Sequence, residues 1–444
     1  MILIYCDESS SRLQYIAAFI FKELLQVQYS ITTHKKGFRE SAGTKLNYSH
    51  QEIMSDELRI PNKGLLFEKG VKPQVIEINF VEGFKCFFKS HPKGEREFPF
   101  DIFSASFYLL SRYEEYLPHE KDKYGRYSCA NSLAYKENFL HLPLVNIWID
   151  YFKNFLVKNN SDFDRELSKP KSAFQFIPTY DVDTAFAYLH KGPVKNFTGI
   201  IGSFVKLKFN KLKERLSVLS GLKKDPFEIF NWLDTIHQTL NLNPIYFFLV
   251  SEKNARHDKN ILPQRGAMAQ LIINHAKTYS IGLHPSWQSG ENFSLLQKEK
   301  KRLENISGKA ISKSRQHYLR FNLPTGYSRL LEAGITGDYS MGYGTNNGFR
   351  ASVASSFLWY DIEKEQQTNL RIFPFCYMDS NVIFHQKLSI EAAEQELMNY
   401  YNVCKKVNGI FIGIFHNHLM GDDNLQWRNL YERFLNKIQE PANV

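Results

Sequence analysis

The sequence predicts an α/β protein built of two parts, and three observations lead to this expectation. Its 444 residues exceed what one ordinary hydrophobic core organises. Strand-like and helix-like segments alternate after residue 170, whereas a polar stretch with few apolar residues occupies 159–170. We therefore expect a smaller N-terminal α/β accessory domain over 1–165 and a larger domain over 170–444, arranged as a parallel sheet or a (β/α) barrel.

The N-terminal domain is expected to open with a strand, a helix and a second strand. Residues 2–6 form a short apolar run, Ser9–Ser11 can cap a helix, and 27–32 is again strand-like. No glycine-rich fingerprint accompanies this unit, so it does not indicate a nucleotide site. Farther along we expect a strand at 73–80 and an aromatic-rich helix at 101–116.

Charged residues in and after this helix permit two interpretations. Arg112, Glu114, Glu115 and Arg126 could form a recognition patch, or they could form a salt-bridge network that holds the domain together. We favour the network, because ion pairs of this kind are common and individually weak.

The larger domain is expected to alternate strands with helices. The predicted strands are 174–180, 244–250, 280–284, 317–321, 337–341, 369–376 and 409–416. The predicted helices are 226–240, 267–278, 295–306, 328–333 and 389–406. In a parallel sheet or barrel of this kind, chemistry gathers at the C-terminal ends of the strands.

Residues 192–226 interrupt this alternation as a long insertion. Its apolar positions between Ile201 and Phe209 fit an amphipathic helix, and its lysines give that helix a basic face. We expect a helical flap packed on the barrel. A lid or a membrane-surface element over the active site is the alternative.

Composition narrows the class of protein. The net charge of +10 is dispersed without a dense basic block, which argues against nucleic acid as a partner. The five cysteines are odd in number and show no CxxC pairing, which favours a reducing compartment. No long apolar run and no secretion signal are found, so we expect a cytoplasmic protein without a transmembrane segment, for which peripheral membrane contact stays open.

A pair of aspartates ends the first predicted strand of the larger domain. In FQFIPTYDVD, Asp181 and Asp183 are one residue apart and would point the same way from an extended chain. Two such carboxylates repel each other unless a cation or a shared proton relieves them. Two aspartates found alone at a strand end more often close the strand in a polar turn. The interpretation therefore depends on whether the later strands end in residues that could share a site with them.

Several later strand ends carry histidine. His284 ends the strand in SIGLHPS, His317 lies in SRQHYLR, and His416 and His418 lie in GIFHNHL. One aspartate and two histidines with an open position suit Zn²⁺ or a similar divalent ion. Such an ion would acidify water and polarise a carbonyl, and the remaining carboxylate and histidine could act as base and acid.

The C-terminal two-thirds resembles the polysaccharide deacetylases of carbohydrate esterase family 4, whose fold is a distorted (β/α)7 barrel. The family's first motif has the form TFDD at a strand end, and TYDVD at Thr179–Asp183 is similar, with one residue inserted between the aspartates. The resemblance implies that Asp181 is the catalytic base and Asp183 a metal ligand.

The family's second motif, H-(S/T)-x-x-H, supplies two metal histidines. His284 matches the first, but Gln288 stands where the second is expected. His317 belongs to the next predicted strand and is our candidate replacement, so that the predicted ligands are Asp183, His284 and His317.

The remaining motifs imply further site residues. Arg315 could fill the role of an arginine that orients the base, and His416 in IFHNH is the implied general acid, with His418 as the alternative. Asp338 and Arg350 occupy the region of a fourth motif that tunes or positions catalytic groups. The predicted catalytic residues are thus Asp181, His416, Arg315 and Asp338, and the predicted substrate-binding residues are His418, Arg350 and Trp287.

These interpretations combine into an expected function. We expect a divalent metal, with Zn²⁺ the expected ion, to support hydrolysis of an N-acetyl group from an amino sugar of a glycan or lipid-linked precursor. One alternative is a catalytically inactive barrel that binds carbohydrate, in which Gln288 reflects a lost metal. Another is a metal hydrolase of a different C–N or ester bond.

Overall fold

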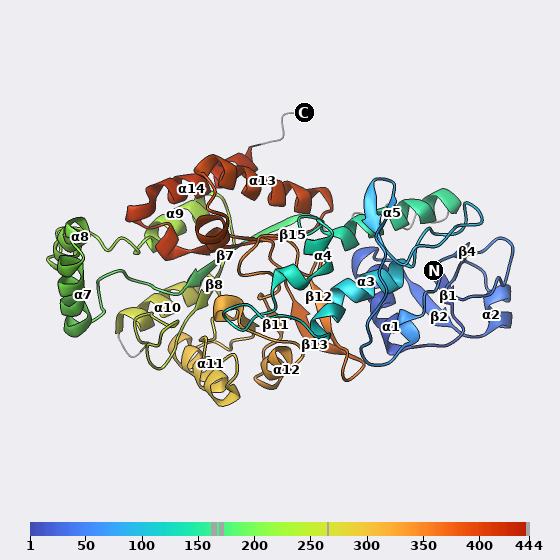
Figure 1. Cartoon of the computed structure of the whole chain (residues 1–444), viewed down its shortest axis with the longest axis horizontal. Helices are drawn as coiled ribbons and strands as arrows, with labels where there is room; N and C mark the ends of the chain where they lie inside the picture. Colours follow the sequence, from blue (N-terminus) through green and yellow to red (C-terminus); the bar gives the residue numbers. More distant parts are fainter. Residues whose placement is uncertain (161–166, 168–172, 264–265, 441–444) are drawn as a thin grey trace.

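The computed structural model describes residues 1–160, 167, 173–263 and 266–440 (Figure 1). The expected linker at 159–170 lies largely outside the described residues, and so does the predicted domain boundary. Within the described residues, no helix combines the length and the apolar character needed to cross a bilayer.

The N-terminal part contains a four-stranded parallel sheet in the order β2-β1-β3-β4. Its strands are β1 (Ile2–Tyr5), β2 (Tyr29–Thr32), β3 (Thr44–Asn47) and β4 (Leu58–Arg59), and β5 (Asn79–Val81) and β6 (Phe84–Cys86) form a separate antiparallel hairpin. Its helices are α1 (Ser11–Ala17), α2 (Lys35–Glu40), α3 (Ile102–Leu110), α4 (Leu133–Lys136) and α5 (Leu144–Asn159).

The predicted start of this part is confirmed. The Ser10 side chain accepts a hydrogen bond from the Leu13 backbone amide and so caps α1, as the serines before the helix predicted. The expected strand at 73–80 is wrong over most of its length, since only its last residues enter β5. The expected helix at 101–116 ends early, because Arg112 adopts a left-handed backbone with φ of 55°.

The larger part is organised by a nine-stranded sheet in the order β12-β13-β11-β10-β9-β8-β7-β15-β14. All neighbouring pairs are parallel except β12 and β13, which form an antiparallel hairpin. The strands are β7 (Gln175–Val182), β8 (Ile245–Phe248), β9 (Ser280–Leu283), β10 (Lys313–Ser314), β11 (Gly337–Asp338), β12 (Phe357–Asp361), β13 (Gln366–Ile372), β14 (Tyr377–Met378) and β15 (Ile410–His416).

Helices flank this sheet (Figure 1). They are α7 (Pro193–Val205), α8 (Phe209–Leu219), α9 (Phe230–Thr239), α10 (Gly266–Thr278), α11 (Phe293–Ser307), α12 (Thr325–Glu332), α13 (Ile390–Lys406) and α14 (Leu425–Gln439). The architecture is therefore mixed α/β, as the alternating pattern predicted.

The sheet is strongly curled. Neighbouring strands lie about 4.8 Å apart, so a flat sheet would separate β8 from β11 by about three such steps. The rings of Phe247 on β8 and Tyr339 after β11 nevertheless lie 5.3 Å apart, and Tyr339 stacks on Phe373 at 4.6 Å. These rings belong to a buried cluster that also takes Ile412 and Ile414 of β15, so the sheet wraps around its own apolar core.

Two predicted strands differ from the structure in ways that matter for the site. The expected strand at 317–321 is wrong, because β10 ends at Ser314 and residues 317–319 form a 3₁₀ turn with positive φ at Tyr318 and Leu319. The expected strand at 369–376 ends early, because β13 stops at Ile372. The chain then crosses to the other end of the sheet order, where β14 begins at Tyr377. The Phe375 amide donates to the Met341 carbonyl, whereas the next amide, of Cys376, donates to the Ile412 carbonyl of β15.

The two parts share one hydrophobic core rather than meeting through a thin linker. Helix α1 packs against the β12–β13 hairpin, where Tyr15 donates to the Leu358 carbonyl at 2.8 Å and Arg12 Nε donates to Glu365 at 2.9 Å. The N-terminal part is thus fixed to one end of the large sheet.

A candidate metal centre at the carboxyl ends of the strands

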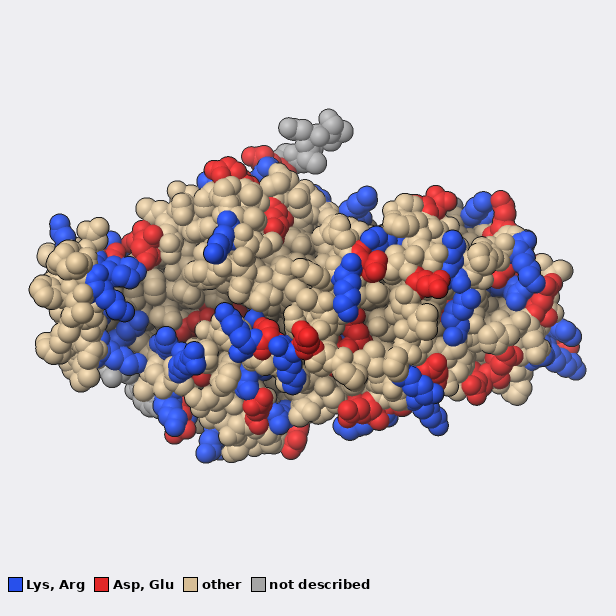
Figure 2. All heavy atoms as spheres, in the orientation of Figure 1, with Lys and Arg blue, Asp and Glu red and all other residues tan. Residues whose placement is uncertain are grey.

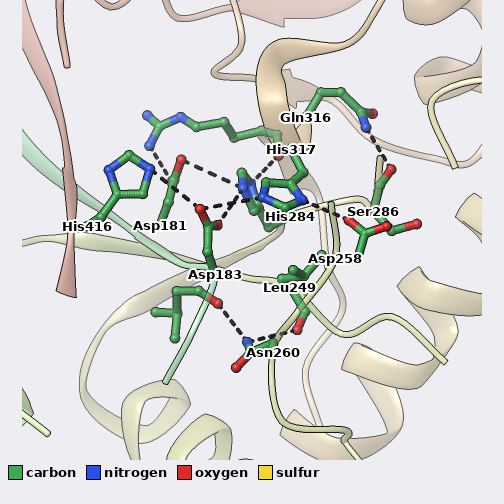
Figure 3. A network of polar contacts seen from close by, with 12 residues as sticks. Asp181, Asp183, Leu249, Asp258, Asn260, His284, Ser286, Gln316, His317 and His416 are labelled. Atoms are coloured by element: carbon green, nitrogen blue, oxygen red, sulfur yellow. Dashed lines mark hydrogen bonds and ion pairs between the residues drawn. The ribbon is translucent and has the colours of Figure 1, made fainter. Parts of the chain in front are cut away.

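Titratable side chains from several strand ends converge at one edge of the sheet. Asp181 lies near the end of β7, and the parallel register sets it opposite His416 of β15. Asp183 follows β7 and His284 follows β9. Figure 3 shows these side chains and His317 pointing toward one another. The expectation that functional side chains gather at strand ends therefore selected residues that are far apart in the sequence and close together in the structure.

Asp183 lies at the centre of this group. Its Oδ1 is 3.0 Å from His284 Nε2, and its Oδ2 is 3.5 Å from His317 Nε2 and 3.6 Å from His416 Nε2. Burial alone would raise the pKa of the Asp183 carboxyl, but the neighbouring His317 and His284 hold it well below its usual range. Asp183 is therefore a carboxylate at neutral pH.

Hydrogen bonds on the far side of each ring orient His284 and His317. His284 Nδ1 lies 2.6 Å from the Arg315 carbonyl oxygen, and His317 Nδ1 lies 2.8 Å from Asp258 Oδ1. Both partners only accept, so each Nδ1 carries the proton and donates it. Each Nε2 is then available to present a lone pair toward Asp183, the arrangement that metal-binding histidines adopt.

While both imidazoles are neutral, neither of them balances the negative charge of Asp183. The buried Asp183 Oδ1 accepts no hydrogen bond, although His284 Nε2 is 3.0 Å away. A carboxylate oxygen and two imidazole lone pairs that face one another repel unless a proton or a cation lies between them. Burial opposes the charged form of His317, but Asp183 and Asp258 raise its pKa to about 9. The same negative field would attract a metal ion.

The donor set fits a divalent cation. The ligand atoms of Asp183, His284 and His317 all lie within 4.8 Å of one another, close enough for one ion to contact all three. Two imidazole nitrogens and one carboxylate oxygen match Zn²⁺ and similar ions in sites that keep a position open. This is the predicted ligand set, and the structure brings its three members together.

A pair formed by an arginine and an aspartate flanks the centre on one side. Arg315 Nη1 donates to Asp181 Oδ1 at 2.8 Å, and Arg315 Nε donates to the Tyr339 carbonyl at 3.0 Å. The guanidinium lies 4.4 Å from the ring centre of Phe247, so it is held on three sides. Asp181 Oδ2 remains on the side of the histidines, 3.9 Å from His284 Nε2. The predicted partnership of Arg315 with Asp181 is present in the structure.

A pair formed by a histidine and an aspartate flanks the centre on the other side. The sequence did not predict the aspartate. Asp379 accepts from His416 Nδ1 at 2.6 Å and from the His416 amide at 2.7 Å. Burial opposes protonation of His416, but the Asp379 carboxylate raises its pKa to about 10. Asp379 directly follows β14, a two-residue strand. The strand-end rule would have selected it if β14 had been predicted.

A cavity of about 440 Å³ opens over the centre, and the N-terminal part supplies one of its walls. Lys123, Tyr124 and Arg126 line it, and Arg126 Nη1 donates to the Tyr318 carbonyl at 2.8 Å. The rings of Tyr124 and Tyr318 pack 5.2 Å apart. The segment DKYGRY therefore belongs to the site, which the sequence did not indicate for Lys123 and Tyr124.

The other lining residues come from the larger part. They are Asp181, Asp183, His284, Gln316, His317, Tyr318, Leu319, Gly344, Met378, Ser380, Phe384, His385, His416, His418 and Leu419. His418 faces the cavity, as expected for a substrate-binding candidate. Burial, followed by the charge of His416, lowers the pKa of His418 to about 4, so it is neutral at pH 7.

Four of the predicted site residues do not line the cavity. One is Arg315, which holds Asp181 from behind, and the others are Asp338, Trp287 and Arg350. Asp338 is buried, accepts from the Ser340 hydroxyl at 2.7 Å, and has its pKa raised to about 6 by burial. The Trp287 ring packs under the Arg320 guanidinium at 3.9 Å, beside the site rather than in it. The cavity gives no support to the catalytic role of Asp338 or to the substrate contact of Trp287, and both stay predictions. Gln288 likewise lines a different hollow, together with Glu299.

Arg350 joins the charged network predicted for the N-terminal helix. Its Nε and Nη2 donate to the two carboxylate oxygens of Glu115 at 2.8 and 2.6 Å. Arg112 also donates to Glu115, at 2.7 Å, and to Glu114. The substrate-binding role of Arg350 stays a prediction, and the structure gives it no support, because the guanidinium is used in a buried pair with Glu115. The favoured salt-bridge interpretation fits Arg112, Glu114 and Glu115, whereas Arg126 lines the cavity.

Comparison with known proteins gives two findings. A family model described as a family of unknown function (DUF7033) matches residues 2–161. A search of curated proteins gives no match.

Solved structures resemble the chain weakly. A polysaccharide deacetylase from Bacillus cereus is 10% identical, with 60% of this chain and 87% of that chain covered and a TM-score of 0.30. Two structures provisionally assigned as polysaccharide deacetylases are each 12% identical. The one from Mycobacterium smegmatis covers 62% of this chain and 87% of its own, with a TM-score of 0.40. The one from Pseudomonas aeruginosa PAO1 covers 61% and 86%, with a TM-score of 0.38. At such scores the likeness carries no argument about activity, which rests on the geometry of the site.

Proposed function

We propose that this protein is a metal-dependent hydrolase that removes an N-acetyl group from an amino sugar, on a curled sheet of the deacetylase-barrel type. The observation that carries the proposal is the arrangement around Asp183. One carboxylate oxygen that accepts no hydrogen bond and two oriented imidazoles face a cavity, with an Arg-held carboxylate on one side and an Asp-held imidazole on the other.

Each side chain has a defined task in this proposal. Asp183, His284 and His317 would hold a divalent ion, which when bound polarises the acetyl carbonyl and lowers the pKa of water. Asp181 accepts the proton of the attacking water. Arg315 holds one oxygen of Asp181 and so aims the other oxygen toward the centre. His416 gives a proton to the leaving amine, because Asp379 holds its Nδ1 and turns Nε2 toward the centre.

The cavity suits a sugar better than an apolar ligand. Tyr124, Tyr318 and Phe384 provide flat apolar surfaces for the faces of a pyranose ring, while Lys123 and His385 offer donors to its hydroxyl or acidic groups. Its size matches a small-molecule site. The alternative of an inactive carbohydrate-binding barrel rests on the missing second histidine. The placement of His317 beside Asp183 favours the hydrolase, because it returns a third donor to the centre.

Acetate release tests this proposal. The purified chain, loaded with Zn²⁺, is incubated with a panel of N-acetyl amino sugars and with O-acetyl sugars, and free acetate is measured. We expect release from at least one N-acetyl sugar, loss of release in Asp183→Ala, and retention in Gln288→Ala, because Gln288 lies outside the cavity. Release from the O-acetyl sugars alone would assign an esterase. The absence of release from every substrate by a metal-loaded chain would contradict hydrolysis of acetyl groups.

A further inference from the structure

The helical hairpin formed by α7 and α8 has an unusual surface. The described residues contain sixteen exposed large hydrophobic side chains, and ten of them lie between residues 194 and 222. Figure 1 places the two helices at one end of the molecule, away from the N-terminal part, and Figure 2 shows this end as a broad uncharged surface bordered by basic side chains. The ten are Val194, Phe197, Ile201, Phe204, Val205, Leu207, Phe209, Leu216, Leu219 and Leu222.

The apolar side of this hairpin faces outward. Val194, Phe197, Ile201 and Phe204 follow helical spacing and form one stripe along α7, which in most helices would pack on the core. Here Phe204 is 62% exposed, and Leu207, in the connection between the helices, is 73% exposed. The expected flap is therefore present as two helices, but its apolar stripe faces outward instead of packing on the rest of the protein.

Polar and small groups make the inward contacts instead. Asn196 is buried, donates to the Tyr188 carbonyl at 3.0 Å and accepts from Arg215 of α8 at 3.1 Å. Gly199 permits this pairing, because a Cβ there would collide with the Arg215 guanidinium. Helix α7 is thus inverted relative to an ordinary surface helix, with the polar Asn196 buried and its apolar residues on the outside, whereas α8 buries Val218.

The root of the hairpin is fixed to the larger part. The Asp225 carboxylate accepts three backbone amide bonds, from Ala187, Tyr188 and Leu189, at 2.7 to 2.9 Å. Glu214 accepts from the Tyr188 hydroxyl at 2.8 Å. These bonds set the direction in which the apolar stripe points, so its exposure is a property of the folded state.

The charges around the stripe are one-sided. Residues 192–226 contain eight Lys or Arg and two Asp or Glu, which leaves a net charge of +6. Both acids are engaged at the root of the hairpin, in the bonds described above for Asp225 and Glu214. Lys206, Lys208 and Lys211 are exposed around the tip, next to Leu207 and Phe209.

We propose that the α7–α8 hairpin docks this protein on the surface of an anionic lipid bilayer. The outward apolar side chains would enter the boundary between headgroups and acyl chains, and the exposed lysines would contact anionic headgroups. The helices are too short to span the hydrocarbon layer, so the hairpin lies on the bilayer rather than crossing it.

Charge and shape favour a bilayer over the other possible occupants. A second copy of the chain would bring the same lysines against one another, and like charges at close range oppose such a contact. A rigid protein partner would need a pocket that matches this protruding tip, whereas lipids adjust to it. The net charge of +6 is what anionic headgroups attract.

Docking would also hold Asp183 within about 35 Å of the start of α7, the longest span that ten residues can bridge. The chain runs from Asp183 to the start of α7 at Pro193 in ten residues. A substrate carried on a lipid would then be presented to the site. This last step rests on the proposed function, whereas docking itself does not.

Vesicle co-sedimentation of the full chain tests the proposal. We use vesicles that mix phosphatidylglycerol with phosphatidylcholine, and vesicles of phosphatidylcholine alone. The test variant is Phe204→Asp/Leu207→Asp/Phe209→Asp, and the matched control is Val75→Asp/Phe80→Asp, which changes exposed apolar side chains of the N-terminal part. A third variant, Lys206→Glu/Lys208→Glu/Lys211→Glu, tests the charge alone.

The expected outcome is binding to the mixed vesicles that weakens as salt is added. The affinity should fall by about a hundredfold or more in the aspartate variant and by about tenfold or more in the glutamate variant. It should stay unchanged in the control. Circular dichroism and metal content of each variant show that the fold is kept, and they separate failure of docking from failure of the metal centre.

Three outcomes would overturn the proposal. These are no binding of the wild-type chain to the mixed vesicles, equal binding to phosphatidylcholine alone, or undiminished binding of the aspartate variant. Self-association that the aspartate variant abolishes, measured by analytical ultracentrifugation in the absence of vesicle binding, would assign the surface to a second copy instead.

Discussion

Two buried clusters of charged side chains, each drawn from segments far apart in the sequence, differ in how completely they are paired. In the cluster around Glu115, both carboxylate oxygens accept from arginines, and Arg350 and Arg112 also bond to neighbouring acceptors. In the cluster around Asp183, one carboxylate oxygen has no hydrogen bond and the histidine nitrogens that face it have their other nitrogens engaged.

The difference separates a structural role from a chemical one. In a fully paired cluster every charged group already has its partners, so none is free to bind a ligand. Such a cluster serves to hold the fold together. A buried oxygen without a partner costs free energy, and the chain retains it where a ligand or ion completes the set. Between these two clusters, the pairing of each atom, rather than the mere presence of charge, therefore distinguishes the chemical role from the structural one. The following predictions test this contrast.

Removal of the proposed base should have the largest effect. In Asp181→Asn, kcat/KM for acetate release should fall by about 10²- to 10⁴-fold, because the amide cannot accept the proton from water. Steady-state acetate release measures this, and metal content should match that of the wild type, because Asp181 is not a proposed ligand. A value within a few-fold of wild type would remove Asp181 from the mechanism.

Loss of the charge partner of His416 should have the next effect. In Asp379→Asn, kcat/KM should fall by about 10- to 100-fold, since such supporting partners usually contribute that much. The Asp379 carboxylate raises the pKa of His416, so its removal should move the basic limb of the pH–rate profile to lower pH. A purely structural role would lower the rate without moving that limb.

Disruption of the paired cluster should affect stability instead of chemistry. Glu115→Ala leaves the buried Arg350 guanidinium without its anion and Arg112 with Glu114 alone, and breaking a buried pair in this way typically costs about 3–5 kcal/mol in the free energy of unfolding. Chemical denaturation compares this variant with Asp183→Ala, for which we expect a much smaller loss. Equal losses in the two variants would show that the two clusters have the same role.

Lowering the pH should have the smallest of these effects, a gradual loss in the free energy of unfolding. Burial opposes its charge, but Arg350 and Arg112 lower the pKa of Glu115 to about 2, below the usual 4.5. A lowered pKa stabilises the fold above the unfolded value and loses this contribution as pH falls through the folded value. The free energy of unfolding should therefore decline between about pH 4.5 and pH 2 through this group. In Glu115→Gln this part of the decline should be absent, and an unchanged slope would contradict the assignment.

The strand-end rule accounts for what the sequence could predict of the site. Asp181, Asp183, His284 and His416 follow apolar runs long enough to be recognised as strands, and parallel strands bring their ends to one edge. The rule missed Asp379, because β14 has only two residues. It also missed Asp258, which lies outside the strands, in the chain between β8 and α10.

Other features depend on tertiary contacts that no local pattern records. His317 reaches the centre through a 3₁₀ turn with positive φ, and not through the predicted strand. Arg350 matches a motif region, but Glu115, 235 residues away, occupies its guanidinium. The amphipathic pattern at 192–226 predicted helices correctly, yet periodicity alone does not tell which side of a helix faces inward.

The metal content of the purified chain tests the central claim most directly. Elemental analysis is made after incubation with Zn²⁺ and removal of excess ion, for the wild type, Asp183→Ala, His317→Ala and the control Gln288→Ala. The account predicts one bound ion per chain in the wild type and in Gln288→Ala, and strong loss in the two ligand variants. A wild-type chain that retains no ion, or a His317→Ala variant that retains it fully, would contradict the assignment of Asp183, His284 and His317 as a metal centre.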